Sequence, residues 1–255
     1  MFEWLNEPHI WLLMGLFLAG ILAFIVSTLA SGGGALILVP LLNATVGVNQ
    51  TAVVLNLGTF IGRPARLLLF WSDINWRIVA YYAPAAIVGA WLGAYLFTSI
   101  KITWLQLLIG VFLISTLWQF RWGKKQRSFQ MPVMAFIPLG FAVSVLGTLV
   151  GALGPVLNPF YLNAELIKES MIATKTANSF LMGVAQISGY AYFGALTYET
   201  ITYGLALGSG AIIGNIIGKK LLQTISTTAF LRWVIAFMVI SGTVLIYKGI
   251  EGVVF

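Results

Sequence analysis

Apolar residues run in stretches of about 20 along the whole chain, and short polar or glycine-rich segments separate these stretches. A helix of about 20 apolar residues crosses the hydrocarbon core of a bilayer, which is roughly 30 Å thick. The pattern therefore predicts an all-α polytopic membrane protein with about eight to ten spans. The predicted segments lie at roughly 9–30, 34–46, 50–70, 77–98, 103–120, 133–152, 154–163, 170–193, 201–221 and 229–249.

The composition agrees with a membrane environment. Hydrophobic residues make up 60% of the 255 positions and charged residues only 8%, whereas a soluble domain has about a quarter of its residues charged. The first apolar run begins near His9 without the basic start and small-residue cleavage site of a signal peptide, so we expect a permanent span. The chain has no cysteine and one histidine, so we expect no disulfide, no metal site and no other cofactor.

The two halves of the chain resemble each other. Three short motifs of the first half recur in the same order in the second half, which chance does not readily produce. We therefore predict a first transmembrane repeat over 1–120, a basic linker over 121–132 and a second repeat over 133–255. The recurring motifs, about 120 to 125 positions apart, are Thr28-Leu29 with Gly34 and Thr148-Leu149 with Gly154, Ala52 and Ala173, and Ile87–Gly93 and Ile212–Gly218.

The distribution of charge predicts the orientation of these repeats. The linker begins with the basic stretch Arg121–Arg127, and cytoplasmic loops carry an excess of Lys and Arg. With this linker in the cytoplasm, an odd number of crossings in each half places both termini outside and inverts one half relative to the other. An even number is the alternative. The expected cytoplasmic residues are Arg77, Lys219, Lys220 and Arg232, and the expected outer residues are Glu3, Glu7, Lys101, Glu199, Lys248 and Glu251.

This orientation also accounts for the net charge of +7. Such a charge can indicate binding to nucleic acid, but in a membrane protein it reports the bias of the loops. We therefore expect a multi-pass membrane protein that contacts lipid and no nucleic acid.

A glycine cluster precedes the short second segment of each half. Ser31–Gly34 precedes a short apolar segment, and the second half has a weaker form at Gly151–Pro155. Glycine costs about 1 kcal/mol relative to Ala inside a helix, and unwound backbone is tolerated in a membrane only inside protein or beside a cavity. The helix that follows such a break presents free N–H groups and a positive dipole end, which favour an anion. Close helix packing is the alternative explanation, and we prefer it for two pairs, Gly89 with Gly93 and Gly214 with Gly218.

Three cationic residues lie inside the predicted spans: Arg63, Arg66 and Lys175. Such residues cost about 3 kcal/mol near the bilayer centre and mark a pathway or a pair. No carboxylate lies deep enough to neutralise them, so we expect their partner to be an anionic substrate. Other roles stay open, because Arg66 can snorkel to the interface, Arg63 can bond to carbonyls freed by Pro64, and Lys175 can anchor its helix. The carboxylates at segment ends are Asp73, Glu165, Glu169 and Glu199.

The absence of a deep carboxylate also bears on coupling. Proton pumps use intramembrane acid relays, so a carboxylate-driven proton cycle is not expected. Passive flow, anion exchange and transport of a protonated substrate stay open. Asn56, Asn178 and Gln186 can donate hydrogen bonds to an oxyanion or tie helices together.

Two series of motifs follow each other along the chain. The first half carries the glycine break that ends in Val39-Pro40, then Asp73-Ile-Asn-Trp76 before Gly89 and Gly93. The second half carries Ala173-Thr-Lys-Thr-Ala and Gly194-Ala-Leu-Thr-Tyr before Gly214 and Gly218. These motifs, in this order, resemble the sulfite exporter TauE/SafE family over essentially the whole chain. The resemblance implies an inner-membrane permease that moves sulfite or a small organosulfonate outward.

The sequence therefore predicts a secondary transporter that exports small anions by alternating access of two inverted repeats. An anion channel and a non-transporting subunit of a complex are the alternatives. An intramembrane enzyme is not expected, because the spans lack a catalytic set of residues, and the sequence leaves homo-oligomerisation open. The expected anion-binding residues are Gly32, Gly33, Gly34, Asn56, Arg63, Gly154, Thr174, Lys175, Asn178 and Gln186.

Overall fold

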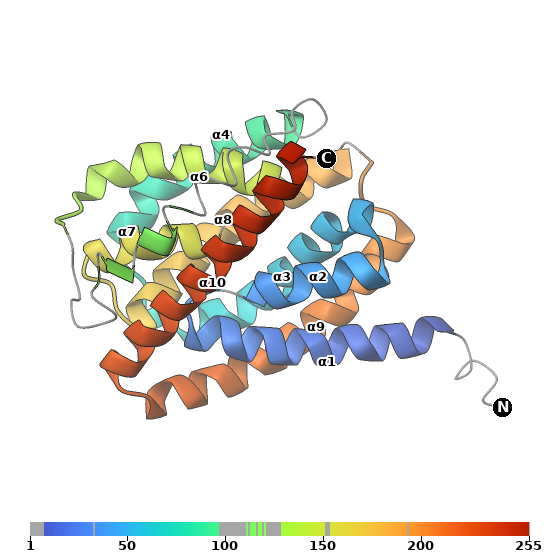
Figure 1. Cartoon of the computed structure of the whole chain (residues 1–255), viewed down its shortest axis with the longest axis horizontal. Helices are drawn as coiled ribbons and strands as arrows, with labels where there is room; N and C mark the ends of the chain where they lie inside the picture. Colours follow the sequence, from blue (N-terminus) through green and yellow to red (C-terminus); the bar gives the residue numbers. More distant parts are fainter. Residues whose placement is uncertain are drawn as a thin grey trace.

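The computed structural model describes residues 8–32, 34–96, 129–150, 154–192 and 194–254, together with isolated positions between 111 and 120. Most of the segment expected at 103–120 and most of the basic linker lie outside the described residues. All regular structure in the described ranges is helical (Figure 1). The helices are α1 (Pro8–Leu29), α2 (Gly34–Thr45), α3 (Val48–Leu69), α4 (Trp76–Leu96), α6 (Phe136–Val150), α7 (Asn158–Asn163), α8 (Glu169–Tyr192), α9 (Tyr198–Thr224) and α10 (Thr227–Val254), with 3₁₀ turns η2 (Trp71–Asp73), η4 (Val133–Ala135) and η5 (Gly154–Leu157).

The lengths of the helices confirm the polytopic all-α prediction. Four of them contain stretches long and apolar enough to cross a membrane, at Ile10–Leu29, Gln50–Leu69, Tyr198–Thr224 and Thr227–Val244. The second helix of each half is short, as expected, with 12 residues in α2 and 6 in α7. A helix of 12 residues is about 18 Å long, so α2 does not reach across a bilayer of about 30 Å.

Glycines bring helices of opposite halves into close contact. A Cβ atom on Gly214 of α9 would lie 2.5 Å from the carbonyl oxygen of Ile21 on α1. A Cβ atom on Gly89 of α4 would lie 2.5 Å from the carbonyl oxygen of Phe141 on α6. These distances leave no room for a side chain, and the packing role predicted for the two GxxxG-type pairs is confirmed.

The contacts also give the direction of each helix in the first of two groups. Phe17 of α1 faces Gly210 of α9, and Thr28 further along α1 faces Gly218, so α1 and α9 run parallel. In the same way α3 runs parallel to α9, since Gly58 contacts Leu207 and Leu69 accepts a hydrogen bond from Lys219. The helices α1, α3 and α9 therefore share one direction.

The second group runs the other way. Asn56 of α3 bonds to Tyr190 of α8, and Arg63 bonds to Ser179, so α3 and α8 are antiparallel. The backbone N–H of Asn75, at the start of α4, donates to Thr174 near the start of α8, and these two helices begin at the same end. Contacts of α4 with α6 also advance together, from Tyr82 with Gly140 to Thr148 with Gly93. Helices at matching places in the two halves thus run in opposite directions, which supports the inverted-repeat interpretation.

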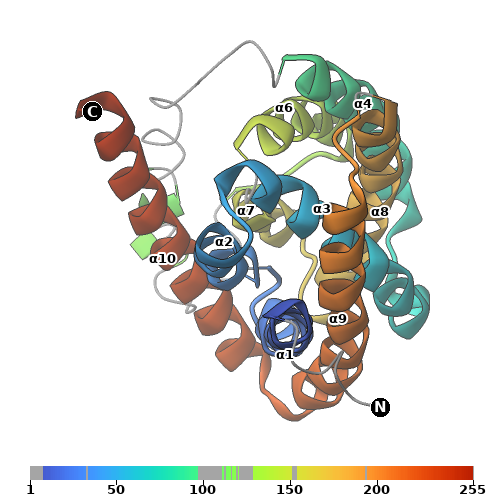
Figure 2. The same cartoon turned by 90° about the vertical axis from the view of Figure 1, so that its right-hand side faces the viewer.

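Two hydrophobic clusters coincide with these groups. One joins α1, α2, α3 and α9, and it includes Leu16, Leu38, Val54 and Leu207. The other joins α4, α6, α7, α8 and α10, it includes the buried Phe136, and Leu222 near the end of α9 also contacts it. Figure 1 shows α4 and α6 along one edge of the molecule and α1 and α9 along the opposite edge, and Figure 2 shows α10 flanking the side of α2 and α7. We call these groups the first bundle and the second bundle.

Basic side chains gather at one end of both bundles. Lys219, near the end of α9, donates to the backbone oxygen of Leu69 at the end of α3, and the start of α4 and of α10 lie at the same end. Exposed aromatic side chains mark both ends, with Trp71 and Trp76 at the basic end and Tyr198 at the other. Aromatic belts and an excess of basic residues on the cytoplasmic side are typical of membrane proteins. The predicted orientation assigns this end, which also carries Asp73, Glu165 and Glu169, to the cytoplasm. The basic residues at this end are Arg77, Lys168, Lys219, Lys220 and Arg232.

Candidate functional site

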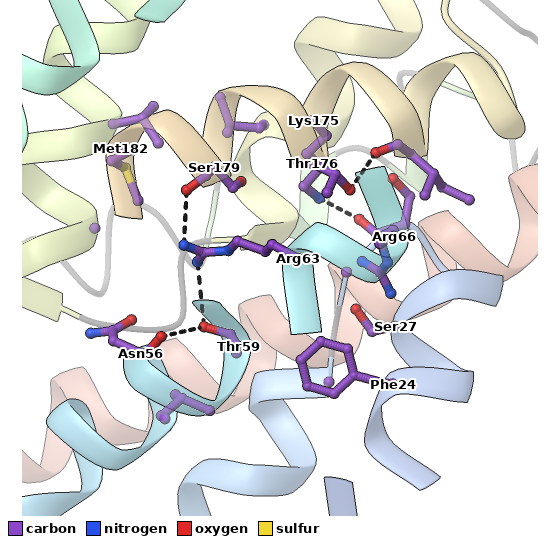
Figure 3. A pocket seen from close by; sticks show the side chains of 18 of the residues that line it. Phe24, Ser27, Asn56, Thr59, Arg63, Arg66, Lys175, Thr176, Ser179 and Met182 are labelled. Carbon is purple, nitrogen blue, oxygen red and sulfur yellow. Dashed lines mark hydrogen bonds between the residues drawn. The ribbon is translucent and has the colours of Figure 1, made fainter. Parts of the chain in front are cut away.

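A cavity of about 180 Å³ lies between the two bundles (Figure 3). Water occupies about 30 Å³ in the liquid, so the cavity has room for a small solute with several waters. Both bundles supply its walls. Its lining residues are Phe24, Ser27, Ser31, Gly32, Gly34, Leu55, Asn56, Thr59, Arg63 and Arg66 from the first bundle, and Tyr82, Val143, Gly147, Leu157, Ile172, Lys175, Thr176, Ser179, Met182 and Gln186 from the second.

The first glycine break forms one wall of this cavity. The chain leaves α1 with Ser31 at φ 49° and Gly32 at φ 126°, conformations in the left-handed region that favours glycine. The N–H of Gly32 bonds back to Ser27 at 2.7 Å and closes the end of α1. The chain then reverses, and Gly34 starts α2 so close to α1 that a Cβ atom would lie 2.8 Å from the oxygen of Ala23. The break therefore builds a helical hairpin whose turn faces the cavity.

The second break lies in the second bundle and is built differently. Residues 151–153 are outside the described ranges, and the chain continues as η5 and then α7. Leu157 of η5 lines the cavity. Asn158, the first residue of α7, is fully buried and turns its side chain toward Lys175.

Lys175 joins the two breaks. Its side chain is 9% exposed, and its ammonium donates to the backbone oxygen of Ser31 and, at 2.6 Å, to Oδ1 of Asn158. Both acceptors are neutral oxygens at places where a helix is interrupted. Lys175 therefore lies inside the bundle and is not an interfacial anchor.

Arg63 reaches from α3 to α8. Its guanidinium donates to the backbone oxygen of Ser179 at 2.8 Å and to Thr59 Oγ1 at 3.3 Å. The bond to Ser179 depends on a glycine, because a Cβ atom at Gly183 would lie 2.1 Å from Nη1 of Arg63. A guanidinium has five N–H donors, so the remaining donors are available to a ligand in the cavity. Arg63 therefore bonds to Ser179 and Thr59, and not to carbonyls freed by Pro64, which is the alternative role drawn from the sequence.

Arg66 is held inside the first bundle. Its Nε donates to Asn215 Oδ1 at 2.8 Å and its Nη2 to Thr28 Oγ1 at 2.7 Å, while the guanidinium lies over the ring of Phe24. Asn215 in turn donates to the backbone oxygen of Gly62 at 2.9 Å. This network joins α1, α3 and α9, so Arg66 does not snorkel to the membrane surface. Figure 3 shows its guanidinium near Lys175, with that of Arg63 directed away from both.

None of these three cations has a carboxylate partner among the described residues. The ion pair found there joins Lys168 to Glu169 at 3.9 Å, at the start of α8. In the low dielectric of a protein interior, charges attract far more strongly than in water. An anion that enters the cavity is therefore attracted to these three cations. Within the described residues, the cations contact neutral groups and one aromatic ring.

Neutral polar groups complete the walls. Asn56 donates to the hydroxyl of Tyr190 at 2.9 Å, and Gln186 lies one turn before Tyr190 on α8. The Oγ of Ser31 and the Oε1 of Gln186 are buried without a hydrogen-bond partner within the described structure. Buried polar groups are generally satisfied in proteins, so these two are candidates to contact a ligand.

Six of the ten predicted site residues line the cavity, and two of the others do not. Thr174 accepts the backbone bond from Asn75, and Asn178 donates to Tyr161 at 2.7 Å, so both stabilise helix contacts. Gly154 begins η5, but its surroundings lie outside the described part of the structure, and Gly33 lies outside the described residues. The six that line the cavity are Gly32, Gly34, Asn56, Arg63, Lys175 and Gln186.

Helical periodicity would have identified several lining residues that the list of expected anion-binding residues lacks. On α3 the lining residues from Asn56 to Arg66 are spaced by three or four, and on α8 the series from Lys175 through Ser179 to Gln186 follows the same rule, with Thr176 adjacent to Lys175. Residues three and four apart share one face of a helix. Extending each face from its cation predicts the missing members, which are Thr59 and Arg66 on α3 and Ser179 and Met182 on α8.

Comparison with known proteins gives one match. A family model described as "Sulfite exporter TauE/SafE" matches residues 16–245, which is most of the chain. No curated protein and no solved structure matches the chain.

Proposed function

The chain belongs to the sulfite exporter TauE/SafE family, and from this premise we propose that it is a secondary transporter that exports sulfite or a small organosulfonate. The family is one of membrane transporters of the exporter type, and the chain is a multi-pass membrane protein. The observation that carries the proposal is the cavity between the bundles, where Arg63, Arg66 and Lys175 lie without a carboxylate among the described residues.

We assign the anion first to Arg63. A planar guanidinium recognises oxyanions through parallel N–H donors, and such charge-assisted bonds are about twice as strong as neutral ones. Asn56 and Gln186 lie on the same walls of the cavity and can turn an amide N–H to the anion. The start of α2, at Gly34, adds the positive end of a helix dipole.

The apolar part of the lining fits the organic end of a sulfonate. Leu55, Val143, Leu157 and Ile172 face the same space as the cations. A bare oxyanion gains nothing from apolar walls, whereas a short hydrocarbon group gains about 0.8 kcal/mol for each CH₂ that it buries. This lining supports organosulfonates beside sulfite as substrates.

Transport by alternating access requires two bodies that move around the site. The contacts between α1 and α9 and between α4 and α6 interlock the two sequence halves through glycine–backbone packing. We therefore assign movement to the first and second bundles, each of which contains helices from both repeats. The two bundles meet between α3 and α8, where Phe60 stacks on Phe180 at 5.3 Å between ring centroids.

Counterflow in proteoliposomes tests this function. Vesicles that contain the purified protein are loaded with unlabelled sulfite, and the uptake of a trace of labelled sulfite is followed, with a parallel series for taurine-like sulfonates and for carboxylates. A transporter gives transient accumulation of label and saturable rates. A rate that stays linear with concentration and shows no counterflow indicates an anion channel, and no flux of any anion contradicts the transport function.

A further inference from the structure

The ammonium of Lys175 occupies a site of the kind that binds a metal cation. Its two acceptors are the backbone oxygen of Ser31, where α1 has ended, and the side-chain oxygen of Asn158, where α7 begins. Ser31 is 2% exposed. Its side-chain Oγ lies at the same break and has no hydrogen-bond partner in the described ranges. Freed backbone oxygens and the C-terminal ends of half-helices coordinate Na⁺ in transporters with interrupted helices.

The electrostatics of the break suit a cation there. The C-terminal end of α1 carries the negative end of its helix dipole, and Ser31 directly follows this end. Backbone and Asn carbonyl oxygens are also among the donors that coordinate hard metal cations. In this protein the cation is the ammonium of Lys175, which belongs to α8 of the second bundle. The carbonyl that it contacts, of Ser31, belongs to the first bundle.

We propose that Lys175 is a built-in replacement for a coupling cation, so that the membrane potential alone drives export of the anion. The inference rests on the proposed function and concerns its energy source. The tethered ammonium holds the two glycine breaks together without binding any ion from solution. Anion movement then requires no co-transported Na⁺.

The charged groups around Lys175 argue against a proton relay. Arg63 and Arg66 of α3 line the same cavity, and Tyr82 of α4 faces it. The hydroxyl of Tyr161 on α7 accepts a hydrogen bond from Asn178, which lies about one turn after Lys175 on α8. The four carboxylates whose side chains the structure describes lie outside the cavity lining: Asp73, Glu165, Glu169 and Glu199.

A potential-driven exporter is energetically sufficient. Moving one charge through 100 mV corresponds to about 2.3 kcal/mol, which sets an equilibrium gradient of about 50-fold for a monovalent anion. A cell interior is electrically negative, so this gradient is directed outward for anions. An exporter of anions needs no other driving ion.

Ion replacement on the wild-type protein tests the inference directly. Proteoliposomes loaded with labelled sulfite receive a K⁺ diffusion potential through valinomycin. We expect efflux to increase when the interior is negative and to be unchanged when choline replaces Na⁺ or when a pH gradient is imposed at a clamped potential. A requirement for Na⁺, or sulfite-dependent movement of protons at a clamped potential, overturns the inference while leaving transport itself established. Absence of flux under every condition contradicts the proposed function instead.

Substitution of Lys175 gives a second, independent arm. Lys175→Ala removes the tethered cation and leaves its oxygens in place, so we expect loss of flux that Na⁺ or methylammonium restores. Lys168→Ala is the matched control, because that ammonium also bonds to a backbone oxygen, of Ile225 at 3.0 Å, but outside the cavity. Failure of every added cation to restore flux in a folded Lys175→Ala protein overturns the tethered-cation role. If this variant does not fold, the wild-type ion replacement decides.

Discussion

Thr28 of α1 lies against Gly218 of α9 so closely that a Cβ atom on the glycine would be 2.8 Å from the threonine Cβ. The equivalent pair, Thr148 of α6 and Gly93 of α4, has a corresponding distance of 2.9 Å. The four residues belong to the motifs that recur in the two halves of the sequence. Each motif of one half therefore packs against the other half, and this exchange creates the two mixed bundles.

Enlarging a glycine at these contacts should destabilise the protein. Gly214→Val and Gly89→Val each place a side chain where a backbone oxygen lies within 2.5 Å, and overpacking costs about 1–3 kcal/mol. We expect a lower thermal unfolding temperature in detergent for both. Gly15→Val is the control, because a Cβ atom there meets nothing within 4 Å. Equal losses of stability in all three variants would contradict the packing role.

Arg63 should determine anion affinity. Arg63→Ala removes charge-assisted hydrogen bonds worth about 1.5–3 kcal/mol each, so we expect affinity for sulfite to fall by about ten- to a hundredfold or more. Arg63→Lys keeps the charge but not the planar donors, and we expect an intermediate affinity. Calorimetric titration of sulfite measures both, with Arg232→Ala as a control outside the cavity. Wild-type affinity in a folded Arg63→Ala protein would exclude this residue from the site.

Arg66 and Asn215 should be energetically coupled. Their bond of 2.8 Å joins α3 to α9, and residues in one network show interaction energies of about 0.5–3 kcal/mol. We expect the double variant Arg66→Met/Asn215→Ala to lose less stability than the sum of the single variants. Thermal unfolding of all four proteins measures the coupling. Strict additivity would show that the bond contributes nothing to the first bundle.

Cross-links should distinguish movement within a bundle from movement between bundles. The chain has no cysteine of its own, so introduced thiols react alone. We expect a short bis-maleimide between Gln50→Cys on α3 and Glu199→Cys on α9, whose side chains are hydrogen-bonded at 3.2 Å inside the first bundle, to leave sulfite flux intact. A short bis-maleimide between Phe60→Cys and Phe180→Cys, which lie on different bundles, should stop it.

The same cross-links also have an outcome that would contradict movement of the two bundles. Flux of each variant is measured before and after cross-linking, so that the substitutions serve as their own controls. If the link between α3 and α9 stops flux and the link between α3 and α8 does not, the moving bodies are the sequence halves and not the bundles.

Much of the local structure could be predicted from the sequence. The spans follow from runs of apolar residues, because a helix satisfies its backbone hydrogen bonds within its own segment. The break at Ser31–Gly34 follows from three glycines that no membrane helix accommodates cheaply. The depth of Arg63 follows from its distance to the ends of its segment. Lys175 lies only about one turn into its segment, so its burial could not be predicted in this way and was decided by the packing.

The tertiary structure alone decided the partners. Arg66 bonds to Asn215, 149 positions away, and Lys175 reaches Ser31, 144 positions away. Such pairs depend on which helix surfaces meet, and an apolar segment carries little information about its neighbour because lipid and protein interior are similarly apolar. Thr174 and Asn178 illustrate the consequence, since they lie beside Lys175 in sequence but point to other helices. The sequence by itself determined where the helices form and break, and only packing decided which side chains share the cavity.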